Sequence, residues 1–183
     1  TQQLKSPQLS FPELHLAIEY RNTMSSWFSS LLARLFSSNT SQNPTDSNST
    51  HIETFPFEER QNTAFGTIHR PVVTVQFHSQ YENNWNQVLM LVDSGADLTI
   101  LPTYLAAFLG LKWSRENKFE TVGIGGNVKL WIVKDVPIRI GKLERKIPVG
   151  ITEQRVPPLL GRHEALETFN VTFNYKEKTI FEN

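Results

Sequence analysis

Residues 90–102 read MLVDSGADLTILP, an apolar run that an acid, a hydroxyl and a glycine interrupt. Asp93, Ser94 and Gly95 are all favoured in turns, so one interpretation is an ordinary turn. A surface turn, however, does not need the apolar residues that flank this one closely on both sides. A metal ligand is a second interpretation, but Asp97 is the one other carboxylate nearby and no histidine is close in sequence. The third is a catalytic carboxylate, held near the core by a glycine turn that brings backbone amides close to it.

The overall composition excludes several classes of function. The chain has 183 residues with 18 basic and 18 acidic side chains, which gives no electrostatic footprint for nucleic acid, so no nucleic-acid partner is expected. Cysteine is absent, which excludes disulfides, thiolate zinc sites and a cysteine nucleophile. The five histidines show no metal-ligand spacing, and we expect neither a metal nor a cofactor. No signal peptide or transmembrane stretch is visible in this sequence, which favours a cytoplasmic location.

The first 50 residues differ from the rest in amino-acid composition and hydrophobic pattern. Residues 13–36 contain neither Gly nor Pro, and their apolar side chains fall within about half of a helical wheel, so residues 1–36 form a predicted amphipathic helical segment. Residues 37–50, SSNTSQNPTDSNST, have no aliphatic or aromatic side chain and are predicted to be a flexible linker. The helix could pack on its own domain or a partner chain, contact a membrane surface through residues 13–36, or act as a pro-segment that shields an active site.

Residues 51–183 have the pattern of one small, mostly β domain. Short β-branched or aromatic runs at 70–79, 87–94, 129–141, 146–152 and 170–182 alternate with turn residues and are predicted to be strands. Residues 102–110, PTYLAAFLG, begin with Pro and end with Gly, as a short helix does. Residues 162–169 look like one or two further helical turns.

Three motifs, taken together, resemble those of the retropepsin-like (retroviral-type) aspartic proteases. LVDSGADLTILP at 91–102 resembles the active-site motif, and VGIGG at 122–126 resembles the glycine-rich tip of the flap. LLGR at 159–162 resembles the apolar-apolar-Gly element that crosses beneath the active-site loop, followed by an Arg common in retroviral members. Each motif alone could be a hairpin tip or ordinary core, but their common order favours the family. The resemblance spans roughly residues 68–176 and implies an all-β domain with short helices.

The resemblance also implies an activity, the hydrolysis of peptide bonds. Carboxylate-catalysed hydrolysis needs two carboxyls, one to take a proton from water and one to donate a proton to the carbonyl oxygen. The chain has a single Asp-Ser-Gly motif, so a second Asp93 must come from another copy, and a symmetric homodimer is expected. The alternative is a catalytically inactive dimerisation or peptide-binding module on the same fold.

The family pattern gives each site residue a role. Asp93 activates the water, the Ser94 hydroxyl braces the partner loop, and Gly95 presents backbone to the substrate. Asp97 contacts the substrate and is also expected to pair with Arg162, although two separate surface charges are an alternative. The remaining predicted substrate-binding residues are Ala96, Ile100, Gly123, Ile124, Gly125, Gly126 and Leu159, of which Ile100, Ile124 and Leu159 would form pocket walls that prefer apolar side chains.

Two features depart from the viral pattern. The chain continues through KEKTIFEN at 176–183, which is expected to form a hairpin with 170–175 and to change the dimer interface. The predicted helix at 102–110 is more typical of cellular or bacterial members. The first 50 residues resemble nothing in the family motif.

Overall fold

The computed structural model describes residues 51–79, 83–114, 116, 118–123 and 126–183. These residues fall within one compact unit, Thr50–Asn183. The predicted helical segment at 1–36 and the predicted linker at 37–50 lie outside the described residues.

The described residues form short strands with little helix, as the sequence predicts. The first strands are β1 (Ile52–Pro56), β2 (Glu58–Asn62), β3 (Gly66–Arg70), β4 (Val72–His78), β5 (Trp85–Val92) and β6 (Thr99–Pro102). The later strands are β7 (Lys118–Gly123), β8 (Gly126–Ile140), β9 (Leu143–Thr152), β10 (Leu159–Leu160), β11 (Asn170–Asn174) and β12 (Lys178–Glu182). The helices are α2 (Thr103–Phe108), where the sequence predicts one, and the 3₁₀ turn η1 (Leu166–Thr168). The segment 162–169, where one or two helical turns are predicted, forms turns followed by the 3₁₀ turn η1.

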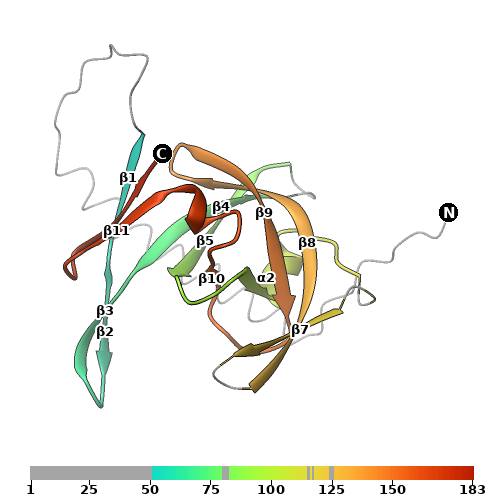
Figure 1. Cartoon of the computed structure of the whole chain (residues 1–183), viewed down its shortest axis with the longest axis horizontal. Helices are drawn as coiled ribbons and strands as arrows, with labels where there is room; N and C mark the ends of the chain where they lie inside the picture. Colours follow the sequence, from blue (N-terminus) through green and yellow to red (C-terminus); the bar gives the residue numbers. More distant parts are fainter. Residues whose placement is uncertain (1–50, 80–82, 115, 117, 124–125) are drawn as a thin grey trace, which may run out of the picture. The chain divides into compact units, whose positions relative to one another are not determined.

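A seven-stranded sheet in the order β4-β5-β10-β6-β9-β8-β7 forms the body of the domain (Figure 1). The sheet curls until β8 also pairs with β4, through Ile138–Ile140. A break in register between Val133 and Val136, with Asp135 at φ 55°, separates this half of β8 from the half that pairs with β7. Such a bulge bends the strand, and here it lets one strand serve both the barrel and the hairpin beyond it.

The core fills the inside of the curled sheet. Alternate residues of β4 and β5 are buried, as expected for strands with one face inward. The largest fully buried side chains are Phe77, Phe181, Met90, Leu101, Leu105, Leu109, Leu130, Ile138, Ile140, Ile147, Ile151 and Leu160. Helix α2 contributes Leu105 and Ala106 to this core.

The two ends of the described chain meet in a separate three-stranded sheet, in the order β1-β12-β11. The predicted hairpin between 170–175 and 176–183 is confirmed, with Asn174 opposite Lys178. The sequence did not predict β1, which pairs along its whole length with β12 from Ile52 opposite Glu182. Strands β2 and β3, also not predicted, form a two-stranded sheet of their own.

Candidate active site

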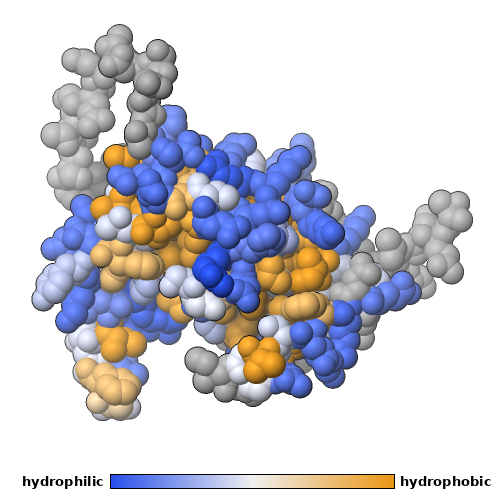
Figure 2. Space-filling view, in the orientation of Figure 1, coloured by the Kyte–Doolittle hydropathy of each residue, from blue (hydrophilic) through white to orange (hydrophobic). Residues whose placement is uncertain are grey.

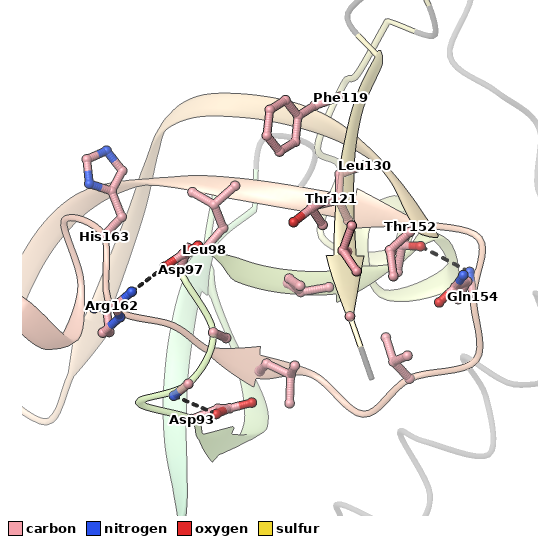
Figure 3. A pocket seen from close by; sticks show the side chains of 18 of the residues that line it. Asp93, Asp97, Leu98, Phe119, Thr121, Leu130, Thr152, Gln154, Arg162 and His163 are labelled. Atoms are coloured by element: carbon pink, nitrogen blue, oxygen red, sulfur yellow. Dashed lines mark hydrogen bonds and ion pairs between the residues drawn. The ribbon is translucent and has the colours of Figure 1, made fainter. Parts of the chain in front are cut away.

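Asp93 lies directly after the last residue of β5, in a tight loop (Figure 3). The Gly95 amide donates to Asp93 Oδ1 at 2.9 Å, and the Ala96 amide donates to the Asp93 carbonyl at 3.2 Å. The Asp93 amide in turn donates to the carbonyl of Leu160 at 3.0 Å. The half-buried carboxyl group is therefore held in one orientation by its own loop, while Ser94 next to it is exposed.

The segment that contains β10 crosses this loop. Leu160 lies opposite Val92 in a parallel pairing with β5, and Leu159 lies opposite Ile100 in an antiparallel pairing with β6. The predicted crossing of residues 159–162 with the active-site loop is thus confirmed.

Gly161 is at the point of closest approach in this crossing. A Cβ at this position would lie 2.3 Å from the carbonyl carbon and oxygen of Leu98 and 2.8 Å from the Thr99 nitrogen. The Gly161 amide donates to the buried Thr99 hydroxyl at 3.3 Å. Only glycine permits this backbone approach, and the Thr99 hydroxyl links the two crossing segments.

The expected pairing of Asp97 with Arg162 is confirmed as an ion pair between the two side chains. The backbone reinforces it, since the Arg162 amide donates to the Ala96 carbonyl at 2.9 Å and the His163 amide donates to the Asp97 carbonyl at 2.8 Å. Beside this pair, His163 Nδ1 lies 3.4 Å from a carboxylate oxygen of Glu167. This polar cluster forms one end of the site, and Figure 3 shows Arg162 directed toward Asp97.

A groove of about 940 Å³ opens in front of Asp93. On the far side it is bounded by the hairpin of β7 and β8, in which Gly123 lies opposite Gly126. The hairpin predicted for the glycine-rich segment is therefore present, although Ile124 and Gly125 at its tip lie outside the described residues.

Most predicted site residues that the structure describes line this groove, namely Asp93, Gly95, Ala96, Asp97, Ile100, Gly123 and Leu159. Ser94 and Gly126 are described but are not among its lining residues. Arg162, which the sequence selects as the partner of Asp97, also lines the groove. Sequence reasoning did not select the other lining residues, which are Leu98, Phe119, Thr121, Val122, Val128, Leu130, Thr152, Gln154, Val156, Pro157, His163 and Glu167. Some of these residues could have been found from the sequence, because side chains alternate along a strand and one face of the β7–β8 hairpin lies toward the groove.

Two ionisable side chains outside the groove have shifted pKa values. Burial raises the pKa of Tyr104, on α2, above its usual 10.0. A hydrogen bond from Lys118, together with its charge, lowers the pKa of Glu120 on β7 below the usual 4.5. Among the described residues, no cluster of three or more His, Asp or Glu side chains could hold a metal ion. No helix in the described part of the chain has the length and apolar character needed to cross a membrane.

This all-β architecture, with a carboxylate loop crossed by an apolar-apolar-Gly segment, is that of a retropepsin-like aspartic protease domain. Residues 80–163 match the family model described as "gag-polyprotein putative aspartyl protease". This segment thus belongs to a retropepsin-like aspartyl protease family, and the resemblance drawn from the three motifs is confirmed. A comparison with curated proteins gave no match.

Proposed function

We propose that the protein is an aspartic endopeptidase that acts as a symmetric homodimer, with one catalytic carboxyl from Asp93 of each subunit. The observation that carries this proposal is the state of the carboxylates in the groove. Asp93, Asp97 and Glu167 line it, but Asp97 pairs with Arg162, and Glu167 lies 3.4 Å from His163 Nδ1 in the polar cluster at the end of the groove. One chain therefore offers one carboxyl group for hydrolysis, and a second copy supplies the other.

In such a dimer the two Asp93 carboxyls lie about 3 Å apart and share one proton, as is general for aspartic proteases. The ionised carboxylate takes a proton from a water molecule while the water oxygen attacks the peptide carbonyl carbon. The protonated carboxyl donates its proton to the carbonyl oxygen. The tetrahedral intermediate then collapses as the C–N bond breaks and the leaving nitrogen receives a proton. Ser94 is exposed beside Asp93, and its hydroxyl is proposed to brace the loop of the second subunit.

The groove walls favour an extended peptide with apolar side chains around the cleaved bond. Leu98, Ile100, Val128, Leu130 and Leu159 line the groove, and burying an apolar side chain against such walls stabilises the complex by about 1.5–3 kcal/mol. The β7–β8 hairpin is proposed to close over the bound peptide as a flap and to exclude water.

The test is hydrolysis of a peptide library by the full chain and by Asp93→Asn. The substitution keeps the shape of the side chain but removes its acid–base function, so cleavage is expected to stop while the thermal unfolding curve stays unchanged. Asp135→Asn is a matched control, since Asp135 is an exposed carboxylate outside the groove and its φ of 55° suits Asn. Peptide binding without hydrolysis by the unsubstituted chain would favour the inactive binding module.

A dilution series tests the assembly. Specific activity is expected to fall with protein concentration, because each monomer has half of the site. A monomer whose specific activity does not depend on concentration would contradict the two-copy site.

A further inference from the structure

Strands β2 and β3, with the turn between them, form an arm that we define as residues 58–70. The two strands pair only with each other, from Glu58 opposite Arg70 to Asn62 opposite Gly66. Within the described part of the chain they make at most marginal contact with other elements. Figure 1 shows the arm extending away from the seven-stranded sheet. An isolated two-stranded hairpin is only marginally stable in water, so this arm needs a further surface to pack on.

The root of the arm lies beside the catalytic loop. Strand β3 runs directly into Pro71, whose carbonyl accepts a hydrogen bond from the Val92 amide at 2.8 Å. The next residue after Val92 is Asp93. At the start of β2, the Phe57 amide donates to the Glu177 carbonyl at 2.8 Å, and the Phe57 ring lies edge-on to Phe173 with centroids 6.3 Å apart. The arm is thus fixed at its base to both the active-site loop and the terminal sheet.

If the site is the two-copy site proposed above, the base of the arm lies close to the second subunit. In that dimer the two-fold axis passes within a few ångströms of Asp93, and the second subunit begins on the other side of the axis. Strands of five residues extend about 17 Å, while a domain of this size has a radius of gyration of about 14 Å. An arm rooted next to the axis is therefore long enough to lie along the body of the second subunit.

The direction of the arm agrees with this placement. In Figure 1 the arm and the β7–β8 hairpin extend the same way from the body of the domain, on either side of β5 in that view. The groove that Asp93 lines is bounded by β7 and β8. In this view the arm and the hairpin that bounds the groove extend from the same end of the domain.

The tip of the arm presents one large apolar side chain. Phe65 is 80% exposed, and Figure 2 shows apolar surface at this end of the molecule. The Asn62 side chain accepts hydrogen bonds from the amides of Ala64 at 2.8 Å and Phe65 at 3.1 Å. Gly66, at φ 71°, completes the turn. The turn is fixed by its own bonds, so Phe65 loses little freedom on docking, which is the property of an effective interface anchor.

The strands of the arm have charges of both signs. Glu58 lies 3.2 Å from Arg60 and 3.9 Å from Arg70, and Glu59 lies 3.6 Å from His69. A two-fold interface brings each surface patch against the same patch or a related one on an identical chain. Mixed charges of this kind avoid the repulsion that an arm of a single sign would cause between two copies.

We propose that the arm, residues 58–70, clasps the second subunit of the dimer, with Phe65 as its anchor on that subunit. The clasp stabilises the pairing of the two Asp93 loops without contributing a group to the chemistry. This inference rests on the proposed dimeric function and adds the surface through which the second copy is held.

The first test measures dimer dissociation of the full chain by sedimentation over a dilution series. Phe65→Ser is expected to raise the dissociation constant about 30-fold per anchor, the effect of losing an aromatic hot spot. Phe65→Leu, which keeps an apolar side chain, is expected to stay close to the unsubstituted protein. Because Phe65 is exposed in the single chain, neither change should alter the unfolding curve at dilutions where the protein is monomeric. Peptide hydrolysis should recover fully at high protein concentration.

The second test locates the tip of the arm. The chain has no cysteine, so Ala64→Cys gives a single attachment point for a photo-cross-linker. A mixture of heavy-isotope-labelled and unlabelled chains is expected to yield cross-links between two different chains. If cross-links fall within one chain, including its residues 1–50, and Phe65→Ser leaves dimerisation unchanged, the clasp is refuted while the two-copy site stands. Concentration-independent hydrolysis by a monomer would instead overturn the proposed function itself.

Discussion

Gly161→Ala is the substitution for which the structure gives the clearest expectation. The new methyl group would lie 2.3 Å from the Leu98 carbonyl, whereas ordinary contacts begin near 3.4 Å, so one of the two crossing segments must move by about 1 Å. The obstacle is backbone, which cannot rotate away as a side chain can. The movement also pulls the Gly161 amide from the buried Thr99 hydroxyl.

The expected cost follows from these two effects. Overpacking a tight site costs about 1–3 kcal/mol, and a buried polar group left without its partner adds about 1–3 kcal/mol. A total near 3 kcal/mol would lower the melting temperature of a domain of this size by about 10 °C. Peptide hydrolysis is expected to fall as well, because the displaced backbone directly follows Asp97 in the active-site loop.

The assay is thermal and urea unfolding of the full chain, with Gly123→Ala as the matched control. At Gly123 an added Cβ would meet a Val128 methyl group at 3.5 Å, which is an ordinary contact, and its φ is not in the left-handed region. The control should therefore unfold close to the unsubstituted protein. A Gly161→Ala protein whose free energy of unfolding stays within about 0.5 kcal/mol of the original would refute the described crossing.

Three further predictions concern the site, the helix α2 and the domain boundary. Arg162→Ala should change the free energy of unfolding by no more than about 1 kcal/mol, since the pair with Asp97 is exposed, but it should raise KM for peptides. Arg162→Lys should recover little of the original KM, because lysine lacks the planar guanidinium group that binds a carboxylate with two hydrogen bonds. The raised pKa of Tyr104 means that unfolding exposes a phenol that ionises more readily, so stability should hold below pH 10 and fall as pH rises beyond it; denaturant titrations should show this fall reduced in Tyr104→Phe. Limited proteolysis should cut within residues 37–50, and the fragment 51–183 should unfold cooperatively and keep its activity, since every motif lies within it.

The active-site loop could be predicted from the sequence because its determinants are local. MLVDSGADLTILP contains a buried strand, a turn and a second strand in sequence order, and those three elements appear as β5, the Asp93 loop and β6. The Asp97–Arg162 pair was also predictable, since Arg162 follows the crossing glycine directly. Gly161 was predictable too, because the close approach of its backbone to Leu98 requires glycine, and the family motif contains glycine at that position.

The terminal sheet and the arm could not be predicted, for two different reasons. Strand β1, IETFP, is stabilised by pairing with β12 at the opposite end of the domain, and no local pattern encodes such a long-range contact. Strand β2, EERQN, has no apolar alternation at all, because it has no core face to fill. The groove could not be predicted for the same reason, since Phe119 and His163 line the same groove as Asp93 only when the β7–β8 hairpin and β10 are in place.

Bonds within one chain orient the active-site loop, and they suggest that the domain folds before the proposed two-copy site assembles. The Gly95 amide orients Asp93 Oδ1, and the Asp93 amide donates to the Leu160 carbonyl. A carboxyl group that is already oriented loses little freedom when its partner arrives, so more of the association energy remains to bring the two loops together. The same logic applies to the arm, whose turn is fixed by Asn62 before it meets any surface. In the proposed dimer, two preformed halves dock, and a change that weakens docking is expected to leave each half folded.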